Sequence, residues 1–98
     1  MTPTIELHPE AMSEARSIRL WYSRRDASAS NAFMLEFDFA LQQIMESPNR
    51  WPSFLHGTRR YLLRRFPYSI VYRVNPAAIE VLAVAHNRKR PGYWAHRE

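Results

Sequence analysis

The feature that most constrains the fold is a run of three short apolar segments in the second half of the chain. These segments, residues 61–66, 68–74 and 79–86, are rich in leucine, β-branched and aromatic side chains, as strands are. Pro67 and the pair Asn75-Pro76 separate them with residues that favour turns. We therefore expect three consecutive strands in one sheet, which has to bury an apolar face against another part of the chain.

The first half of the chain predicts a short strand followed by a helix. Residues 4–7 alternate polar and apolar side chains, which is typical of a strand. A helix is expected from Pro9, a residue favoured at the first helical position, to about Arg24. Its apolar face recurs at helical spacing and consists of Ala11, Ala15, Ile18, Trp21 and Tyr22.

A second helix is expected from Ser28 or Ser30, either of which can serve as its N-cap, to about Glu46 before the Ser47-Pro48 pair. Its apolar stripe comprises Phe33, Phe37, Ala40, Leu41 and Ile44. The element order is therefore β-α-α-β-β-β, and the fold class is α+β. We expect a helical hairpin packed on one face of a small, mainly antiparallel, curved sheet. The N-terminal strand is expected to pair within that sheet as its fourth strand, in a single domain spanning residues 1–98.

Alternation along the strands predicts which side chains the helices cover. We expect one side of the strand at 68–74 to face the helices, namely Tyr68, Ile70, Tyr72 and Val74. In the preceding strand, one side is shared by Arg60, Leu62 and Arg64. The loop at 47–57 is expected to bring Trp51 and Phe54 back over an edge of the core. The second face of the sheet should then remain uncovered, concave and partly basic.

Charge is divided unevenly along the chain. Residues 1–58 carry five arginines against seven acidic residues, a net of −2, whereas residues 59–98 carry nine basic residues against two acidic ones, a net of +7. All but one of the 14 basic residues are arginine, whose planar guanidinium suits bidentate binding of carboxylate or phosphate. The basic half therefore implies an acidic partner, such as nucleic acid, a nucleic-acid enzyme or an acidic protein segment.

Composition also limits the cellular compartment and the kinds of binding site that we expect. The chain has no cysteine, and its N-terminus lacks a basic segment followed by an apolar run. No uncharged stretch approaches the length of a membrane span. The histidines His8, His56 and His96 are scattered without metal-ligand spacing. We therefore expect a cytoplasmic protein with no metal site, no cofactor and no membrane partner.

Five stretches of the sequence resemble one known family. They are HPEA at 8–11, WY at 21–22, ESPNRWP at 46–52, RRFPYSIVYRV at 64–74 and IEVLAVAHNRKRPGYW at 79–94. In order and spacing they resemble the RelE/ParE superfamily, the toxins of bacterial type II toxin–antitoxin (plasmid stabilisation) modules. The resemblance spans nearly the whole chain and implies the compact β-α-α-β-β-β toxin fold that the periodicity also predicts.

The superfamily contains two activities, and the resemblance carries different residues over from each. RelE-like members are ribosome-dependent mRNA endonucleases that cut in the A site with basic residues and a tyrosine, whereas ParE-like members poison DNA gyrase. Arg60 and Arg64 stand where the nuclease branch has basic residues, and Tyr93 stands at its C-terminal tyrosine. If the chain is a nuclease, we expect a rearranged catalytic site made of Arg60, Arg64, His86, Arg88 and Tyr93.

Three positions depart from the nuclease pattern. Leu62 stands where a lysine is usual, and Ser69 and Asn87 stand where arginines are usual. Cleavage by 2′-hydroxyl attack needs positively charged groups that stabilise the pentavalent phosphate and a group that moves a proton, and neither serine nor asparagine supplies them. The resemblance therefore favours the ParE-like branch, whose members need no catalysis of their own.

The candidate residues for binding the target or the antitoxin are Arg60, Arg64, Arg65, Arg73, Arg88, Lys89, Arg90 and Tyr93. Alternatives remain open for two neighbours of this set. His86 either acts as an acid or base near neutral pH or orients the C-terminal residues through hydrogen bonds. Trp94 either offers a stacking surface to a partner or packs back on the helices.

The paired arginines Arg64 and Arg65 also have two interpretations. They either contact a partner or pair within the chain with an acidic residue of the helices, such as Glu10, Glu14 or Asp38. The favoured function is a ParE-like toxin that inhibits DNA gyrase and is neutralised by a cognate antitoxin with an acidic segment. The first alternative is a RelE-like endonuclease acting on ribosome-bound mRNA. The second is a non-toxic family member that only binds an antitoxin.

Overall fold

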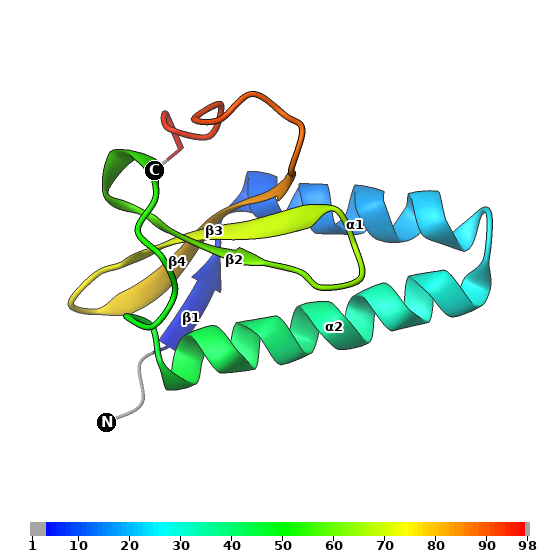
Figure 1. The fold of residues 1–98 in the computed structure, drawn as a ribbon, viewed down its shortest axis with the longest axis horizontal. Helices are drawn as coiled ribbons and strands as arrows, with labels where there is room; N and C mark the ends of the chain where they lie inside the picture. Colours follow the sequence, from blue (N-terminus) through cyan, green and yellow to red (C-terminus); the bar gives the residue numbers. More distant parts are fainter. Residues whose placement is uncertain (1–3, 98) are drawn as a thin grey trace.

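The computed structural model describes residues 4–97, and its helices and strands follow the expected order (Figure 1). The elements are strand β1 (Thr4–Leu7), helices α1 (Pro9–Ser23) and α2 (Ala27–Glu46), a short 3-10 turn η1 (Leu55–Gly57), and strands β2 (Arg59–Leu62), β3 (Tyr68–Val74) and β4 (Ala78–His86). No helix in the described part of the chain is long and apolar enough to cross a membrane.

The four strands form one sheet in the order β1-β4-β3-β2. β1 runs parallel to β4, and the pairs β2–β3 and β3–β4 are antiparallel. The expected α+β fold with a mainly antiparallel sheet is therefore confirmed. β1 joins as the fourth strand, at an edge.

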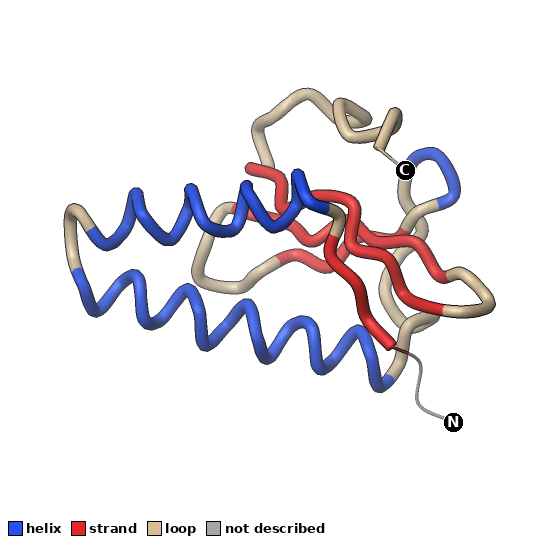
Figure 2. The backbone as a smooth tube through the Cα atoms, turned by 180° about the vertical axis from the view of Figure 1, so that it is seen from behind, coloured by secondary structure: helices blue, strands red, loops and turns tan. Residues whose placement is uncertain are grey.

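The main core lies between the helical hairpin and one face of the sheet (Figure 2). Phe33 and Ile44 of α2 and Ile70 and Tyr72 of β3 are fully buried there. Complete burial of each such side chain contributes about 1.5–3 kcal/mol. The predicted inward side of β3 is confirmed except at Val74, which is exposed because it ends the strand beyond the helices.

Helix α2 begins earlier than expected. Its N-cap is Asp26, whose Oδ1 accepts the backbone N–H of Ser28 at 2.9 Å. The prediction of Ser28 or Ser30 as the cap is wrong, because Asp26 already satisfies this orphan donor and the helix starts at Ala27. Ser30 is buried instead, and its hydroxyl donates to the Arg19 carbonyl across the hairpin at 3.3 Å.

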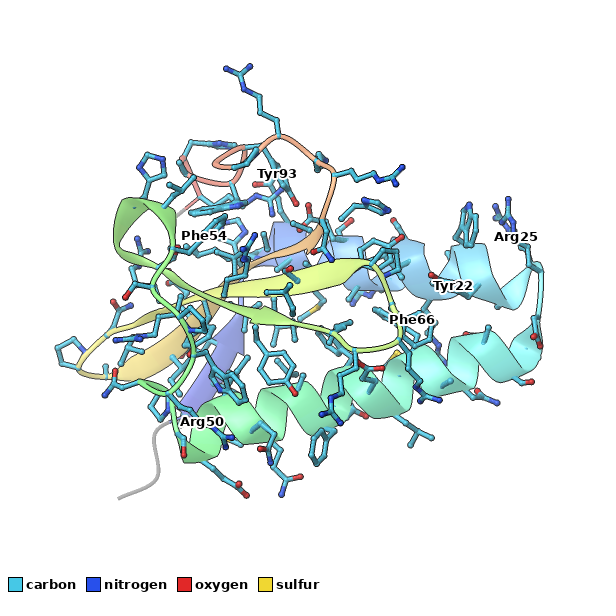
Figure 3. All side chains as sticks on the ribbon, viewed as in Figure 1. Tyr22, Arg25, Arg50, Phe54, Phe66 and Tyr93 are labelled. Atoms are coloured by element: carbon cyan, nitrogen blue, oxygen red, sulfur yellow. The ribbon has the colours of Figure 1, made fainter. Side chains whose placement is uncertain are left out.

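Strand β2 lies two residues earlier than the predicted 61–66 and is shorter. The chain leaves the sheet after Leu62 and turns, so that Phe66 packs edge-on against Tyr22 and Phe33, with ring centroids 5.1 and 5.4 Å away (Figure 3). The aromatic residue that indicated a strand is therefore an anchor of the β2–β3 turn in the main core. Packing the Phe66 ring into the core is therefore more favourable than extending the hydrogen bonds between β2 and β3.

Strand β4 contains a bulge that changes which side chains reach each face. Val71 of β3 pairs with Ala83 and Tyr72 pairs with Val81, so Leu82 is an extra residue in β4. Val81 therefore joins the main core, whereas Leu82 and Ala83 both belong to a second apolar cluster on the opposite face.

This opposite face is not open at its centre, and the expectation that it remains uncovered is wrong. Val71, Leu82 and Ala83 are covered by Trp94, which is 1% exposed. Phe54 packs at the border of the same cluster, whereas Trp51 packs on the main core. Without a cover, Val71, Leu82 and Ala83 would expose a continuous apolar surface to water, which is unfavourable. Residues of the C-terminal segment bury this surface.

Candidate functional site

The candidate site is built around the C-terminal turn, residues 87–97, which arches over the second face of the sheet (Figure 1). The backbone N–H of Asn87 donates to the Pro67 carbonyl at 2.8 Å, and that of Lys89 donates to the His86 carbonyl at 2.9 Å. Gly92 has φ +86°, a conformation that favours glycine, and reverses the chain. The reversal brings Trp94 onto the second apolar cluster rather than onto the helices.

A small basic hollow lies between β2, the end of β4 and the C-terminal turn. The cationic residues that line it are Arg60, Lys89 and Arg90, which we call the basic cluster. Its volume is about 30 Å³, which corresponds to one water molecule. The cluster therefore offers its charge to a partner at the rim rather than to a small molecule enclosed within.

Aromatic rings, not carboxylates, hold two of these cations. The Arg60 guanidinium lies 4.2 Å from the centre of the Phe54 ring, and Lys89 Nζ lies 4.1 Å from that of Tyr93. The basic cluster forms no ion pair with any acidic residue in the described part of the chain. Its charge is therefore available to an anionic partner.

The base of this hollow contains the two positions that depart from the nuclease pattern. Ser69 is 2% exposed, and its hydroxyl donates a hydrogen bond to Asn87 Oδ1 at 2.5 Å. The two side chains therefore satisfy one another where paired arginines would supply charge. Leu62, the third departure, is exposed at the end of β2.

Tyr93 is committed to a contact inside the molecule. Its hydroxyl donates to Glu14 Oε2 on α1 at 2.6 Å, and Lys89 Nζ lies 4.1 Å from the centre of its ring. Burial and the hydrogen bond to the Glu14 carboxylate together raise the pKa of Tyr93 well above its ordinary value. The phenol is therefore poorly suited to move a proton near neutral pH.

Two residues to which the sequence gave no such role, Glu14 and Arg97, hold the C-terminal turn in place. Arg97 is 7% exposed, and its guanidinium donates to both oxygens of Glu14, at 2.8 and 3.1 Å. Burial opposes ionisation of Glu14, but hydrogen bonds from Arg97, Tyr93 and the Val84 amide outweigh it and lower its pKa. Arg97 follows the Tyr93-Trp94 pair near the C-terminus, outside every predicted helix and strand. Hydrophobic periodicity therefore could not indicate this role.

The predicted arginines Arg64 and Arg65 lie apart from the basic cluster. They occupy the β2–β3 turn, where both backbone N–H groups donate to the carboxylate of Glu36 on α2. The pairing partner is thus Glu36 rather than Glu10, Glu14 or Asp38. Together with exposed apolar residues they line a shallow groove, the α2 groove, formed by Leu35, Glu36, Phe39, Arg64 and Arg65.

Three further predicted residues lie outside both sites or on their border. Arg73 forms a cross-strand ion pair with Glu80 at 2.5 Å. His86 Nδ1 accepts the backbone N–H of Arg88 at 3.1 Å, which favours the interpretation that this histidine orients the turn. Arg88 itself is exposed. The structure therefore brings together Arg60, Lys89, Arg90 and Tyr93, and separates Arg64, Arg65 and Arg73 from them.

The part of the chain from residue 4 to residue 97 contains no cluster of three or more histidine or acidic residues able to hold a metal ion. The site consists of arginine, lysine, aromatic and amide groups. These groups bind anions and stack on planar surfaces.

Comparison with solved structures finds the same fold in two other proteins. A structure of the chromosomal ParDE TA system from P. aeruginosa superposes with a TM-score of 0.76, covering 87% of this chain and 96% of that chain at 18% identity. The E. coli toxin RelE, solved as a double mutant in the free state, superposes with a TM-score of 0.62 over 90% of this chain and 86% of that chain at 17% identity. At these identities the likeness concerns the fold.

Comparison of sequences is more specific. Toxin ParE2 of Mycobacterium tuberculosis, in strains CDC 1551 / Oshkosh and H37Rv, is 32% identical over 59 residues. The match covers 60% of this chain and 56% of the relative, so the chain spans little more than half the length of these relatives. The family described as "ParE toxin of type II toxin-antitoxin system, parDE" matches residues 5–91, nearly all of the described chain. The chain belongs to the ParE toxin family of type II toxin–antitoxin systems.

Proposed function

We propose that this protein is a toxin that inhibits DNA gyrase without catalysis of its own and is neutralised by a cognate antitoxin. The observation that carries the proposal is the match of residues 5–91 to the ParE toxin family. The relatives named above carry the same family name, Toxin ParE2. The geometry of the site then favours one of the two activities that the superfamily resemblance implies.

The site favours a binding role over mRNA cleavage. Ser69 and Asn87 bond to one another where a nuclease needs cationic groups around the scissile phosphate. The Tyr93 hydroxyl donates a hydrogen bond to the Glu14 carboxylate, and the pKa of Tyr93 is raised. Positive charge remains in the basic cluster, and His86, which also lines the hollow, uses Nδ1 to accept the backbone N–H of Arg88.

We assign the basic cluster to the toxic target. Arg60, Lys89 and Arg90 carry charge that no described carboxylate neutralises, beside the aromatic rings of Phe54 and Tyr93. Gyrase holding cleaved DNA presents a polyanion next to protein surface, the type of partner that such a mixed surface suits. Arg88, exposed beside the cluster, adds to the same field.

We assign the α2 groove to the antitoxin. Leu35 and Phe39 are one helical turn apart on α2 and are 71% and 55% exposed. The exposed Arg65 side chain lies beside them. An amphipathic segment with apolar residues and carboxylates would cover both features, with apolar contacts that persist at high salt.

A gyrase assay tests the target. The purified protein is expected to reduce supercoiling by gyrase and to accumulate cleaved DNA. Arg60→Ala combined with Arg90→Ala should weaken inhibition about tenfold or more, because two unpaired charges leave the contact surface. The matched control, Arg16→Ala combined with Arg19→Ala, removes equal charge from α1 and should leave inhibition nearly unchanged.

Two further experiments distinguish the alternative functions. New mRNA ends at the ribosomal A site in a translating extract, lost in Tyr93→Phe, would establish the endonuclease instead. Normal growth on expression without an antitoxin, and no effect on gyrase in vitro, would leave only the non-toxic antitoxin-binding member.

The antitoxin assignment has its own test. The protein is co-expressed with an antitoxin candidate, a small reading frame sought beside its gene, and Leu35→Ser combined with Phe39→Ser is expected to reduce co-purification and to release toxicity. Leu20→Ser, at a residue 54% exposed on α1, provides the matched control. Full co-purification of the double variant would place the antitoxin elsewhere.

A further inference from the structure

The edge of β4 is only partly covered by β1. Register pairs run from Thr4 with Ala78 to Leu7 with Val81, so β4 continues past the end of β1 without a strand partner on that side. An edge of this kind exposes backbone groups that otherwise pair with another strand or with water. In this protein, two side chains satisfy these groups.

Glu14 and Arg97 bind the unpartnered part of β4 directly. Glu14 Oε1 accepts the backbone N–H of Val84 at 3.0 Å, and Arg97 Nη1 donates to the Leu82 carbonyl at 2.9 Å. The two side chains, joined to each other by a bidentate ion pair, therefore occupy the place of a neighbouring strand.

The same carboxylate fixes both ends of a short segment that contains Trp94. Tyr93 donates to Glu14 on one side of Trp94 in the sequence, and Arg97 binds it three residues further on. Trp94 between them fills the second apolar cluster. The packing of Trp94 and the hydrogen bonds from Tyr93 and Arg97 to Glu14 therefore belong to one contact between the C-terminal turn and the rest of the molecule.

This contact extends to the basic cluster. The Tyr93 ring, oriented by its hydrogen bond to Glu14, lies 4.1 Å from Lys89 Nζ. Lys89 and Arg90 line the hollow together with Tyr93 and Trp94. The position of these cations relative to Arg60 on β2 therefore depends on a residue of α1.

We propose that Glu14 is a positioning residue: its carboxylate docks the C-terminal turn on the edge of β4 and thereby sets Lys89 and Arg90 beside Arg60 for the target. The inference rests on the proposed gyrase function for its activity readout only. Glu14 itself contacts Val84, Tyr93 and Arg97 rather than the partner.

Glu10 provides a matched control on the same helix. Its side chain is 54% exposed, and Oε2 lies 3.3 Å from Arg97 Nε without the alignment of a hydrogen bond. Glu10→Gln makes the same chemical change as Glu14→Gln at a carboxylate that bonds neither β4 nor Tyr93 in the structure. A general effect of lost negative charge would appear in both variants.

Hydrogen exchange of the full chain tests the docking. In Glu14→Gln, amide exchange at Val84 and in residues 92–97 should be about tenfold faster, with helix α2 unchanged, since only a local opening becomes easier. Arg97→Lys should resemble it, because an ammonium cannot make the forked contact with Glu14 while also binding the Leu82 carbonyl. Glu10→Gln should exchange nearly like the wild type, because its ion pair with Arg97 is exposed on the Glu10 side and contributes little.

Gyrase inhibition tests the consequence. Glu14→Gln should need about tenfold more protein for half-maximal inhibition, while its affinity for the co-expressed antitoxin stays unchanged, because the α2 groove is not involved. Equal exchange at Val84 and 92–97 in Glu14→Gln and Glu10→Gln would overturn the docking. Unaltered inhibition with an undocked turn would overturn the positioning role.

Failure of the proposed function gives a different pattern. If the wild type leaves gyrase unaffected, the assignment of the target is lost, but the exchange experiment still decides whether Glu14 docks the turn. If the wild type inhibits gyrase and every variant inhibits equally, the target assignment stands and the positioning role is rejected.

Discussion

The ring of Phe54 lies against the indole of Trp94, with centroids 5.9 Å apart, on the sheet face that the helices do not cover. Phe54 comes from the loop before β2 and Trp94 from the C-terminal turn, so two segments far apart in the sequence close the second cluster. Figure 3 shows Phe54 and the neighbouring Tyr93 on this side of the molecule.

Truncation of Trp94 should therefore destabilise the whole domain. Trp94→Ala is expected to lower the free energy of unfolding by about 3–5 kcal/mol, because it leaves a cavity over Val71 and Leu82. Urea denaturation followed by circular dichroism measures the change. Trp21→Ala, at an indole 48% exposed, should cost about 1 kcal/mol or less, and equal losses would contradict the packing described here.

The β2–β3 turn should depend on the carboxylate of Glu36 and hardly at all on the Arg65 side chain. Glu36→Ala leaves the backbone N–H groups of Arg64 and Arg65 without their acceptor and is expected to cost about 1–3 kcal/mol of stability. Arg65→Ala removes a side chain that is 66% exposed and 3.5 Å from Glu36, with an expected cost of about 0–1 kcal/mol. Thermal denaturation of both variants provides the comparison, and a larger effect of Arg65→Ala would reverse the assignment.

Stability should fall at alkaline pH through Tyr72. Burial raises the pKa of Tyr72 from 10.0 to about 12, and its hydroxyl donates to the Pro48 carbonyl at 2.6 Å. A raised pKa contributes stability below the unfolded value, which is lost as pH rises through the folded value, between about pH 10 and 12. Urea midpoints across this range should fall less steeply in Tyr72→Phe, although this variant starts about 1 kcal/mol lower at neutral pH. Part of the slope should remain, because the pKa of Tyr93 is raised as well.

At acid pH the same reasoning applies to Glu14 with the opposite sign. Burial opposes its ionisation, but hydrogen bonds from Arg97, Tyr93 and Val84 hold its pKa below the ordinary value of 4.5. Its contribution to stability is therefore present above about pH 4.5 and is lost as pH falls through the lowered pKa. Acid titration monitored by tryptophan fluorescence should show a shallower slope in Glu14→Gln than in Glu10→Gln. Identical slopes would show that protonation of Glu14 is not what destabilises the folded protein at acid pH.

The sequence by itself determined the order of the elements and most of the main core. Residues such as Ile18, Phe33 and Ile70 were predicted inward because helix and strand geometry fixes the direction of each side chain from its neighbours. The same local rules failed at Phe66, where strand propensity competed with aromatic packing against Tyr22. They also placed the cap of α2 two or four residues late, at Ser28 or Ser30, because aspartate and serine are both good caps.

Only the tertiary structure decided which arginines are free and what covers the second face of the sheet. Arg97 and Glu14 are separated by 83 positions, and nothing in their neighbourhoods indicates the contact between them. Arg73 is ion-paired, Arg64 and Arg65 lie in a turn, and the basic cluster has no ion pair with a described carboxylate. This division of the cations likewise follows from chain reversals after Leu62 and at Gly92. Local periodicity indicates the direction in which a side chain points, but the residue that it contacts depends on long-range packing. The candidate site is made of contacts between residues far apart in the sequence, so only the tertiary structure could define it.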